Sequence, residues 1–186
     1  DPTPLSHNPC PERQLIGCDQ NPEAADSAPS SIAENPQELA MRAGAPLFAG
    51  MGDFSMPITT NDADAQRYFD QGMVLAFAFN HAESIRSFKA AQTLDPDCGM
   101  CFWGEALAIG PNINVTSKGK VIMSAAERVA AFSAITKALA LATKTTPREQ
   151  AYIEALAERY NGNPQTPREP LDEAWARAMG EVSQAY

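Results

Sequence analysis

The sequence is poor in the features that nucleic-acid-binding and membrane-spanning proteins need. Its 186 residues include 14 Lys and Arg against 23 Asp and Glu, for a net charge of −9. The basic residues stand singly, as at Arg67, Arg86 and Lys89, so no cluster is present to neutralise a phosphate backbone. No run approaches 18 apolar residues, the length that a membrane-spanning helix requires. We therefore expect no nucleic-acid partner and no membrane span.

Recognised arrangements of catalytic residues are also missing. The chain has only two His, His7 and His81, and it contains no Ser/His/Asp order, no phosphate-binding glycine loop and no HExxH. Its carboxylate pairs lack the His or aromatic neighbours that would tune their pKa values. We expect no enzymatic activity, no catalytic residues, no cofactor and no metal.

The chain contains few cysteines, and they lie close together in the sequence two by two. The four Cys form two close pairs, Cys10 with Cys18 and Cys98 with Cys101. An even number in close pairs is typical of an oxidising compartment, and a chain that begins at Asp1 fits a mature protein whose signal peptide has been removed. A cytosolic metal site gives similar spacing, and an engineered fragment also lacks the first Met. Both pairs are disulfide candidates, and we predict a periplasmic or extracellular location.

The first 60 residues differ from the rest. Residues 1–36 are rich in Pro, Ser, Asn and Glu and have no apolar period, which predicts an extended arm. A short helix is expected over 36–42. Residues 43–60 contain three Gly and two Pro and are predicted to be a loop, with apolar side chains that pack on the helices. The predicted domains are thus 1–60, an arm and apolar loop, and 61–186, a helical domain.

Start and stop signals then predict an all-α chain. Capping residues are expected at Asn61, Asn80, Asp97, Ser124 and Thr146, and Asn80, Ser124 and Thr146 are each followed three residues later by Glu. The predicted helices cover about 61–79, 80–94, 98–109, 124–143, 147–161 and 167–186.

A 34-residue pattern can be placed on 65–98. Counting from Ala65, an aromatic residue falls at position 4, Gly at 8, a large apolar residue at 11, a small residue at 20, an aromatic at 24, Ala at 27 and Pro at 32. The residues are Tyr68, Gly72, Leu75, Ser84, Phe88, Ala91 and Pro96. Small residues let paired helices approach, and Phe88 is expected to fill the space between pairs.

This pattern resembles the tetratricopeptide repeat, strongly over 65–97 and more weakly to 186. The runs Phe79-Asn80-His81-Ala82-Glu83 and Asp95-Pro96-Asp97-Cys98 are also similar to a longer, exported bacterial family of unassigned function. The resemblance implies about three helical hairpins, at 65–97, 98–143 and 147–186. The last stops at Tyr186 without a cap, so we expect a further chain segment or a partner protein to cover it.

In tetratricopeptide stacks, partners usually bind a concave surface formed by the first helix of each hairpin. That resemblance implies a partner-binding groove with an aromatic and Met stripe, suited to a peptide or helix. The alternative is that these side chains belong to the core or lie under the 43–60 loop. The residues are Gln66, Phe69, Met73, Phe77, Met100, Trp103 and Leu107.

Two further candidate sites lie at opposite ends of the first hairpin. Cys98 and Cys101 form a CxxC at a helix start, which is a structural disulfide, a metal site or a redox pair. At the other end, Asn80, His81, Asn112 and Asn114 are predicted to converge at one edge. The alternative for His81 is a hydrogen-bonded turn residue. About 14 helical residues, or roughly 20 Å, separate His81 from the CxxC, so the two are not expected to share a metal.

The function that the sequence favours is a non-enzymatic protein-interaction scaffold, a subunit or assembly component of a larger complex. The alternative is a metal- or redox-linked binding protein that uses Cys98 and Cys101, or His81.

Overall fold

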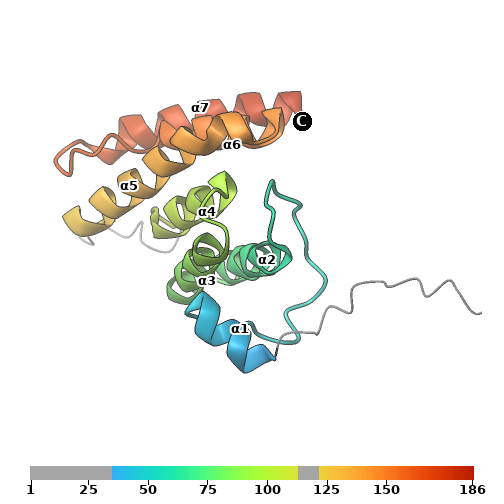
Figure 1. The fold of residues 1–186 in the computed structure, drawn as a ribbon. Coiled ribbons are helices and arrows are strands. Elements are labelled where there is room, and N and C mark those ends of the chain that lie inside the picture. Colours follow the sequence, from blue (N-terminus) through green and yellow to red (C-terminus); the bar gives the residue numbers. More distant parts are fainter. Residues whose placement is uncertain (1–34, 113–121) are drawn as a thin grey trace, which may run out of the picture. The chain divides into compact units, whose positions relative to one another are not determined.

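The computed structural model describes residues 35–112 and 122–186 (Figure 1). These residues belong to one compact unit, Glu34–Tyr186. Within the described ranges the secondary structure comprises seven α-helices and a short 3-10 helix, with no strand. The prediction of an all-α chain is confirmed.

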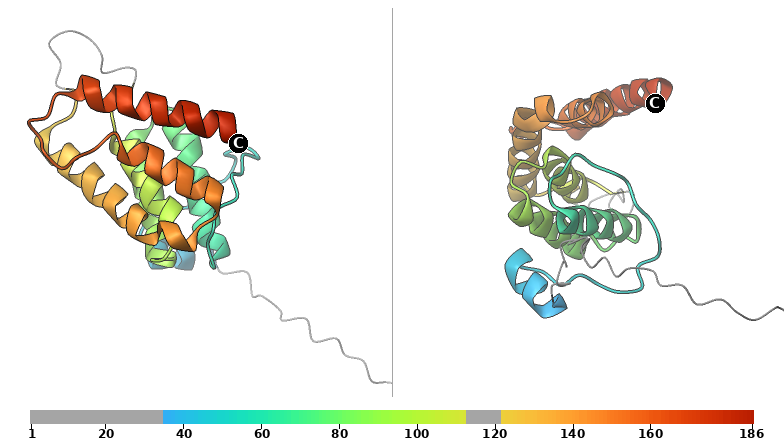
Figure 2. Two further views of the ribbon diagram at one scale, coloured as in Figure 1. Left: turned by 90° about the horizontal axis from the view of Figure 1, so that it is seen from above. Right: turned by 45° about the vertical axis from the view of Figure 1, so that its right-hand side comes forward.

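The helices pack in the order in which they occur in the sequence. α2 packs against α3, α4 against α5 and α6 against α7, while α3–α4 and α5–α6 contacts join these pairs (Figures 1 and 2). α1 packs on α3, and α4 also touches α2 and α6. The bounds are α1 Pro36–Ala43, α2 Ala63–Phe77, α3 His81–Leu94, α4 Gly99–Ile109, α5 Ala125–Leu141, η2 Ala142–Lys144, α6 Pro147–Ala157 and α7 Arg168–Ala185.

Two of the predicted capping boxes are present. The Ser124 side chain accepts a hydrogen bond from Glu127 N at the start of α5, and Thr146 accepts one from Glu149 N at the start of α6. In both, the glutamate side chain accepts in return from the capping residue's backbone N–H. Such boxes satisfy donors that the first helical turn leaves free, so these starts follow from local sequence.

Two predicted caps are wrong, and a third lacks its predicted bonds. α2 is capped by Asp62 rather than Asn61, because the Asp62 side chain reaches the N–H groups of Asp64 and Ala65. Asn80 is the N-cap of α3, as predicted, but its side chain makes no capping bond, and the Glu83 side chain of the predicted capping box pairs with Arg86. α4 is capped by the Cys98 sulfur rather than by Asp97, which forms an ion pair with Lys144.

Phe88 of α3 occupies the space between the first two helix pairs. Its ring is fully buried and lies edge-on to Phe69, with 5.5 Å between ring centroids. A Cβ added at Gly72 of α2 would lie 2.7 Å from the Phe88 ring, and one at Gly104 of α4 would lie closer still. Phe88 is therefore covered by a glycine from each neighbouring helix, and the expectation that it fills the space between pairs is confirmed.

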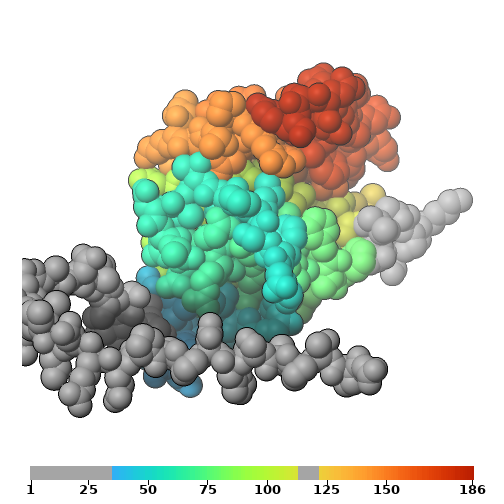
Figure 3. Space-filling model, turned by 90° about the vertical axis from the view of Figure 1, so that its right-hand side faces the viewer, coloured from blue at the N-terminus to red at the C-terminus, as the bar shows by residue number. Residues whose placement is uncertain are grey.

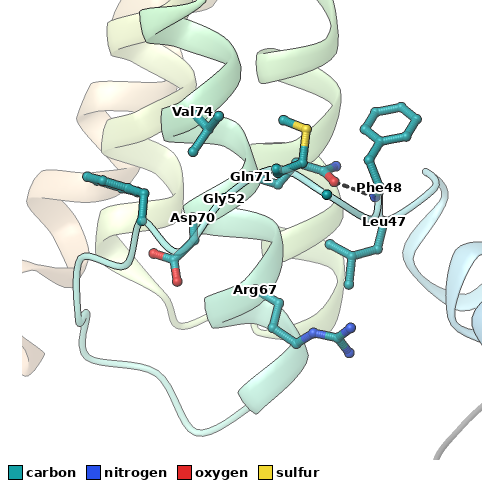
Figure 4. A pocket seen from close by; sticks show the side chains of 10 residues that line it. Leu47, Phe48, Gly52, Arg67, Asp70, Gln71 and Val74 are labelled. Carbon is teal, nitrogen blue, oxygen red and sulfur yellow. Dashed lines mark hydrogen bonds between the residues drawn. The ribbon is translucent and has the colours of Figure 1, made fainter.

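The segment 44–62, between α1 and α2, is held by polar side chains of the helices. Gln71 of α2 accepts from Phe48 N and donates to Pro46 O, and Figure 4 shows the first of these contacts beside a cavity of about 230 Å³. Farther along, Glu149 of α6 accepts from both N and Oγ1 of Thr59, each at 2.6 Å. Segment 44–62 therefore packs on the helices, and it lies beside α6 and α7 on one face (Figure 3).

Candidate functional site

A cavity of about 510 Å³ lies between segment 44–62 and helices α2, α4, α6 and α7; we call it the aromatic cavity. Segment 44–62 contributes residues 54–57. Each of the four helices contributes two side chains, and in every helix the two are four residues apart. These pairs are Met73 and Phe77, Trp103 and Leu107, Arg148 and Tyr152, and Trp175 and Met179.

The repeated spacing explains how the cavity forms. Residues four apart project from the same face of a helix, one turn above the other. Four helices that each turn such a face inward give a wall of aromatic, Met and Leu side chains. Aromatic and flexible thioether groups are typical of binding surfaces that adapt to apolar ligands.

One wall of the cavity is rigid. Trp103 of α4 is 5% exposed, and its Nε1 donates to the backbone O of Tyr152 at 3.0 Å. The Trp103 and Tyr152 rings meet edge to face, with their centroids 5.9 Å apart. The hydrogen bond and the ring contact join α4 to α6 directly, so this wall keeps its shape when the cavity is empty.

The mouth of the cavity exposes apolar rings to solvent. Phe77 is 69% exposed and Phe54 is 43% exposed, and their rings lie edge to face at 6.4 Å. Exposed aromatic pairs beside an apolar cavity are typical of binding surfaces. The mouth therefore combines one ring from α2 with one from segment 44–62.

Two donors in the lining lack acceptors among the residues described. The guanidinium of Arg148 lies 5.7 Å from the centroid of the Tyr152 ring, and no ion pair involves it within 35–112 and 122–186. The Nε1 of Trp175 is buried and has no hydrogen-bond partner. Arg148 is the only charged residue in the lining, which contains no carboxylate.

Two buried arginines and a half-buried aspartate form an ionic cluster between the end of α6 and the start of α7. Asp172 accepts from Arg159 Nε at 3.0 Å and from Arg168 Nη2 at 2.6 Å. Burial raises the pKa of the Asp172 carboxyl, but the hydrogen bonds and charges of Arg168 and Arg159 outweigh it and hold that pKa below its usual value. Arg159 also lies 4.0 Å from the centroid of the Trp175 ring, so the cluster fixes one face of a cavity residue.

Beside this cluster, Tyr160 is buried and its hydroxyl donates to Ala106 O of α4. Burial raises the pKa of Tyr160 to about 12, so the phenol keeps its proton and this hydrogen bond at neutral pH.

The structure divides the seven predicted groove residues into three groups. Met73, Phe77, Trp103 and Leu107 line the aromatic cavity. Phe69 and Met100 are fully buried in the core, in agreement with the alternative interpretation of the stripe. Gln66 holds segment 44–62, because it accepts from Ile58 N and donates to Met56 O. The partner-binding role of these residues stays a prediction.

Sequence reasoning missed the half of the cavity that the last helix pair provides. Arg148, Tyr152, Trp175 and Met179 were not among the predicted groove residues. The pairs 148/152 and 175/179 carry the same four-residue spacing as 73/77 and 103/107, so that spacing was the available signal. The sequence did not indicate that α7 lies across the cavity from α2 and α4.

The predicted edge site is partly assembled. His81 and Asn112 both line a second cavity, of about 560 Å³, with Glu127 of α5. Asn80 is not part of the lining described, and Asn114 lies outside the described residues. Both ring nitrogens of His81 are buried without a hydrogen-bond partner, so the alternative of a hydrogen-bonded turn residue finds no bond in the residues described. Phe79, two residues before His81, has a positive φ of 60°.

Cys98 and Cys101 form a disulfide, one of the three alternatives that the sequence left open for this pair. Both residues are fully buried, and Cys98 Sγ also accepts from Cys101 N at the start of α4. An external thiol can therefore reach this bond only after the start of α4 opens. The other predicted pair, Cys10 with Cys18, lies outside the described residues.

No set of three or more His, Cys, Asp or Glu side chains is grouped as a metal site within 35–112 and 122–186. Over the same residues, no helix combines the length and apolarity that crossing a membrane requires. Comparison with known protein families, curated proteins and solved structures gives no match.

Proposed function

We propose that this chain is a tetratricopeptide-like, non-enzymatic scaffold whose aromatic cavity binds an apolar segment of a partner protein. Support for the repeat comes from three successive helix pairs, at 63–94, 99–141 and 147–185, close to the expected hairpins 65–97, 98–143 and 147–186. The fit of Phe88 between Gly72 and Gly104 adds to it. The proposal includes a periplasmic or extracellular location, which the paired cysteines favour, and membership of a larger complex.

The observation that carries the proposal is the construction of the aromatic cavity. α2, α4 and α6 are the first helices of the three pairs, and each turns two side chains four residues apart into the cavity. Its volume of about 510 Å³ is within the range of ligand pockets, and its lining is mostly apolar. With Phe77 and Phe54 exposed at the mouth, an apolar side chain gains favourable burial by entering.

The alternative of a redox-linked protein has less support, because both Cys98 and Cys101 are bonded to each other and fully buried. Redox-active cysteines are usually partly exposed and lie in an electropositive environment.

Phe77→Ser tests the proposal. Phe77 is mostly exposed, so its loss costs little stability, but it removes half of the aromatic mouth. We expect a partner that co-purifies with the wild-type chain from its native extract to bind Phe77→Ser about tenfold more weakly, since burying one large apolar side chain contributes about 1.5–3 kcal/mol. Binding is measured by titration of the recovered partner.

The matched control is Met41→Ser, because Met41 is 77% exposed on α1 and lies outside the cavity. It is expected to bind the partner as the wild type does. Equal binding by wild type and Phe77→Ser, or recovery of the chain alone, would contradict the proposal.

A further inference from the structure

The aromatic cavity carries one cation and no anion, and this restricts what can enter it. Its lining is mostly apolar, with the Arg148 guanidinium, the Ser55 hydroxyl and no carboxylate. From this we infer that the occupant is a partner segment with a large apolar side chain next to an acidic one, whose carboxylate binds Arg148. The inference rests on the proposed function and specifies the chemistry of the partner.

Arg148 is suited to receive an anion. It occupies the first turn of α6, beside Pro147, and its side chain is exposed. Its guanidinium rests near the Tyr152 ring, whereas other arginines of the described chain, such as Arg42, Arg67 and Arg86, form ion pairs. A guanidinium placed over a ring at the edge of an apolar cavity is positioned in advance for a carboxylate.

Trp175 contributes ring surface rather than a hydrogen-bond donor. Its Nε1 has no hydrogen-bond partner among the residues described and is shielded from solvent even with the cavity empty, so an occupant meets the ring and not the N–H. Arg159 lies 4.0 Å from the centroid of this ring. The apolar side chain of a partner segment can therefore pack on the Trp175 ring while its carboxylate binds Arg148.

The shape of the mouth favours a chain segment over a small molecule. The cavity is lined by segment 44–62 and four helices, and the rings at its mouth are exposed. A segment can therefore lay one side chain inside while both of its ends continue in solvent. Arg148 is the charged residue of the lining, so an acidic side chain of the segment is attracted to this end of the cavity.

The test uses two acetylated and amidated heptapeptides, Ser-Gly-Glu-Phe-Glu-Gly-Ser and the same peptide with Gln in place of both Glu. Binding is followed by intrinsic fluorescence, because the only two Trp of the chain, Trp103 and Trp175, both line the cavity. We expect the wild type to bind the Glu peptide about three- to fivefold more tightly than the Gln peptide, as an exposed ion pair allows. In Arg148→Gln the ratio is expected to fall to about one.

Arg177→Gln is the control, since Arg177 is an exposed arginine of α7 outside the cavity, and it should keep the wild-type ratio. Equal binding of the two peptides by the wild type, or a ratio that survives Arg148→Gln, overturns this inference but leaves the proposed function in place. If neither peptide alters the fluorescence, this inference is overturned as well, while the proposed function is decided by the Phe77→Ser test. If octanoate binds more tightly than both peptides, the cavity is a small-molecule site and the partner segment is excluded.

Discussion

Phe88 shows how much of this fold depends on residues that have no side chain. Its ring lies against Gly72 on one helix and Gly104 on another, so the distance between helices is set by two missing Cβ atoms. Interiors are packed densely enough that one extra methyl group forces neighbours to move. The two glycines therefore matter because they leave room for the Phe88 ring, and not because they make the backbone flexible.

Gly104→Ala is expected to destabilise the fold by about 1–3 kcal/mol, because the added Cβ overlaps the Phe88 ring and that buried ring has little room to move. The measurement is the midpoint and slope of urea unfolding.

Gly180→Ala in α7 is the matched control, since nothing lies within 4 Å of a Cβ built there. It is expected to stabilise the chain by about 0.5–1 kcal/mol through helix propensity. Two substitutions of the same kind should thus act in opposite directions. A Gly104→Ala protein as stable as the wild type would contradict the packing described for Phe88.

Among the elements, α4 is the most fully buried, and its start is held by the Cys98–Cys101 disulfide. The closed loop contains only four residues, so chain-entropy arguments give about 2 kcal/mol of stabilisation. The double variant Cys98→Ala/Cys101→Ala is expected to lose about that amount in urea unfolding and to keep the fluorescence response of the cavity. Loss of ligand binding at unchanged stability would instead favour a functional cysteine pair.

The start of a helix could be predicted from the sequence where the residues that cap it lie close together in the chain. The starts of α5 and α6 were predictable because the capping boxes of Ser124 and Thr146 lie within four residues. The cap of α2 was not, since Asn61 and Asp62 are both good capping residues and only the backbone geometry selects Asp62. The Cys98 sulfur that caps α4 also belongs to the Cys98–Cys101 disulfide. Residue propensities therefore do not predict this cap.

The candidate site was half predictable for the same reason. Met73, Phe77, Trp103 and Leu107 belong to the part of the chain where the repeat pattern is clear, so their helical face could be assigned. Trp175 and Met179 belong to α7, where the pattern is weak. Trp175 and Met179 lie opposite α2 because helices about 100 residues apart in the sequence pack around one cavity. No local sequence pattern specifies such long-range packing.

At the scale of the whole molecule, Glu149 joins segment 44–62 to the last helix pair. Burial raises the pKa of this carboxyl, but the hydrogen bonds donated by Thr59 and Thr146 outweigh it and hold the pKa below its usual value of 4.5. A group whose pKa is lowered by folding contributes stability above its unfolded pKa and loses that contribution as the pH falls through the folded value. Glu149 therefore stabilises the fold at neutral pH and less so in acid.

Glu149→Gln is expected to cost about 1–3 kcal/mol at pH 7, because it removes a charged acceptor that serves four donors. The difference from the wild type should shrink as the pH falls below about 4.5. The measurement is urea unfolding between pH 3 and pH 7. The exposed Glu154 of the same helix provides the control, and Glu154→Gln should change stability little at any pH. A Glu149→Gln deficit that stays constant over this range would contradict the assignment.

The sharing of Phe88 between Gly72 and Gly104 also bears on how such a chain can evolve. The pattern of the sequence divides the chain at Pro96, between the first helix pair and the second, yet the ring of the first pair is completed by a glycine of the second. Duplication or exchange of a hairpin at Pro96 would bring a new helix over Phe88, and only a helix with glycine at that position would be accepted. The unit that recombination can move is therefore defined by this contact and not by the sequence period.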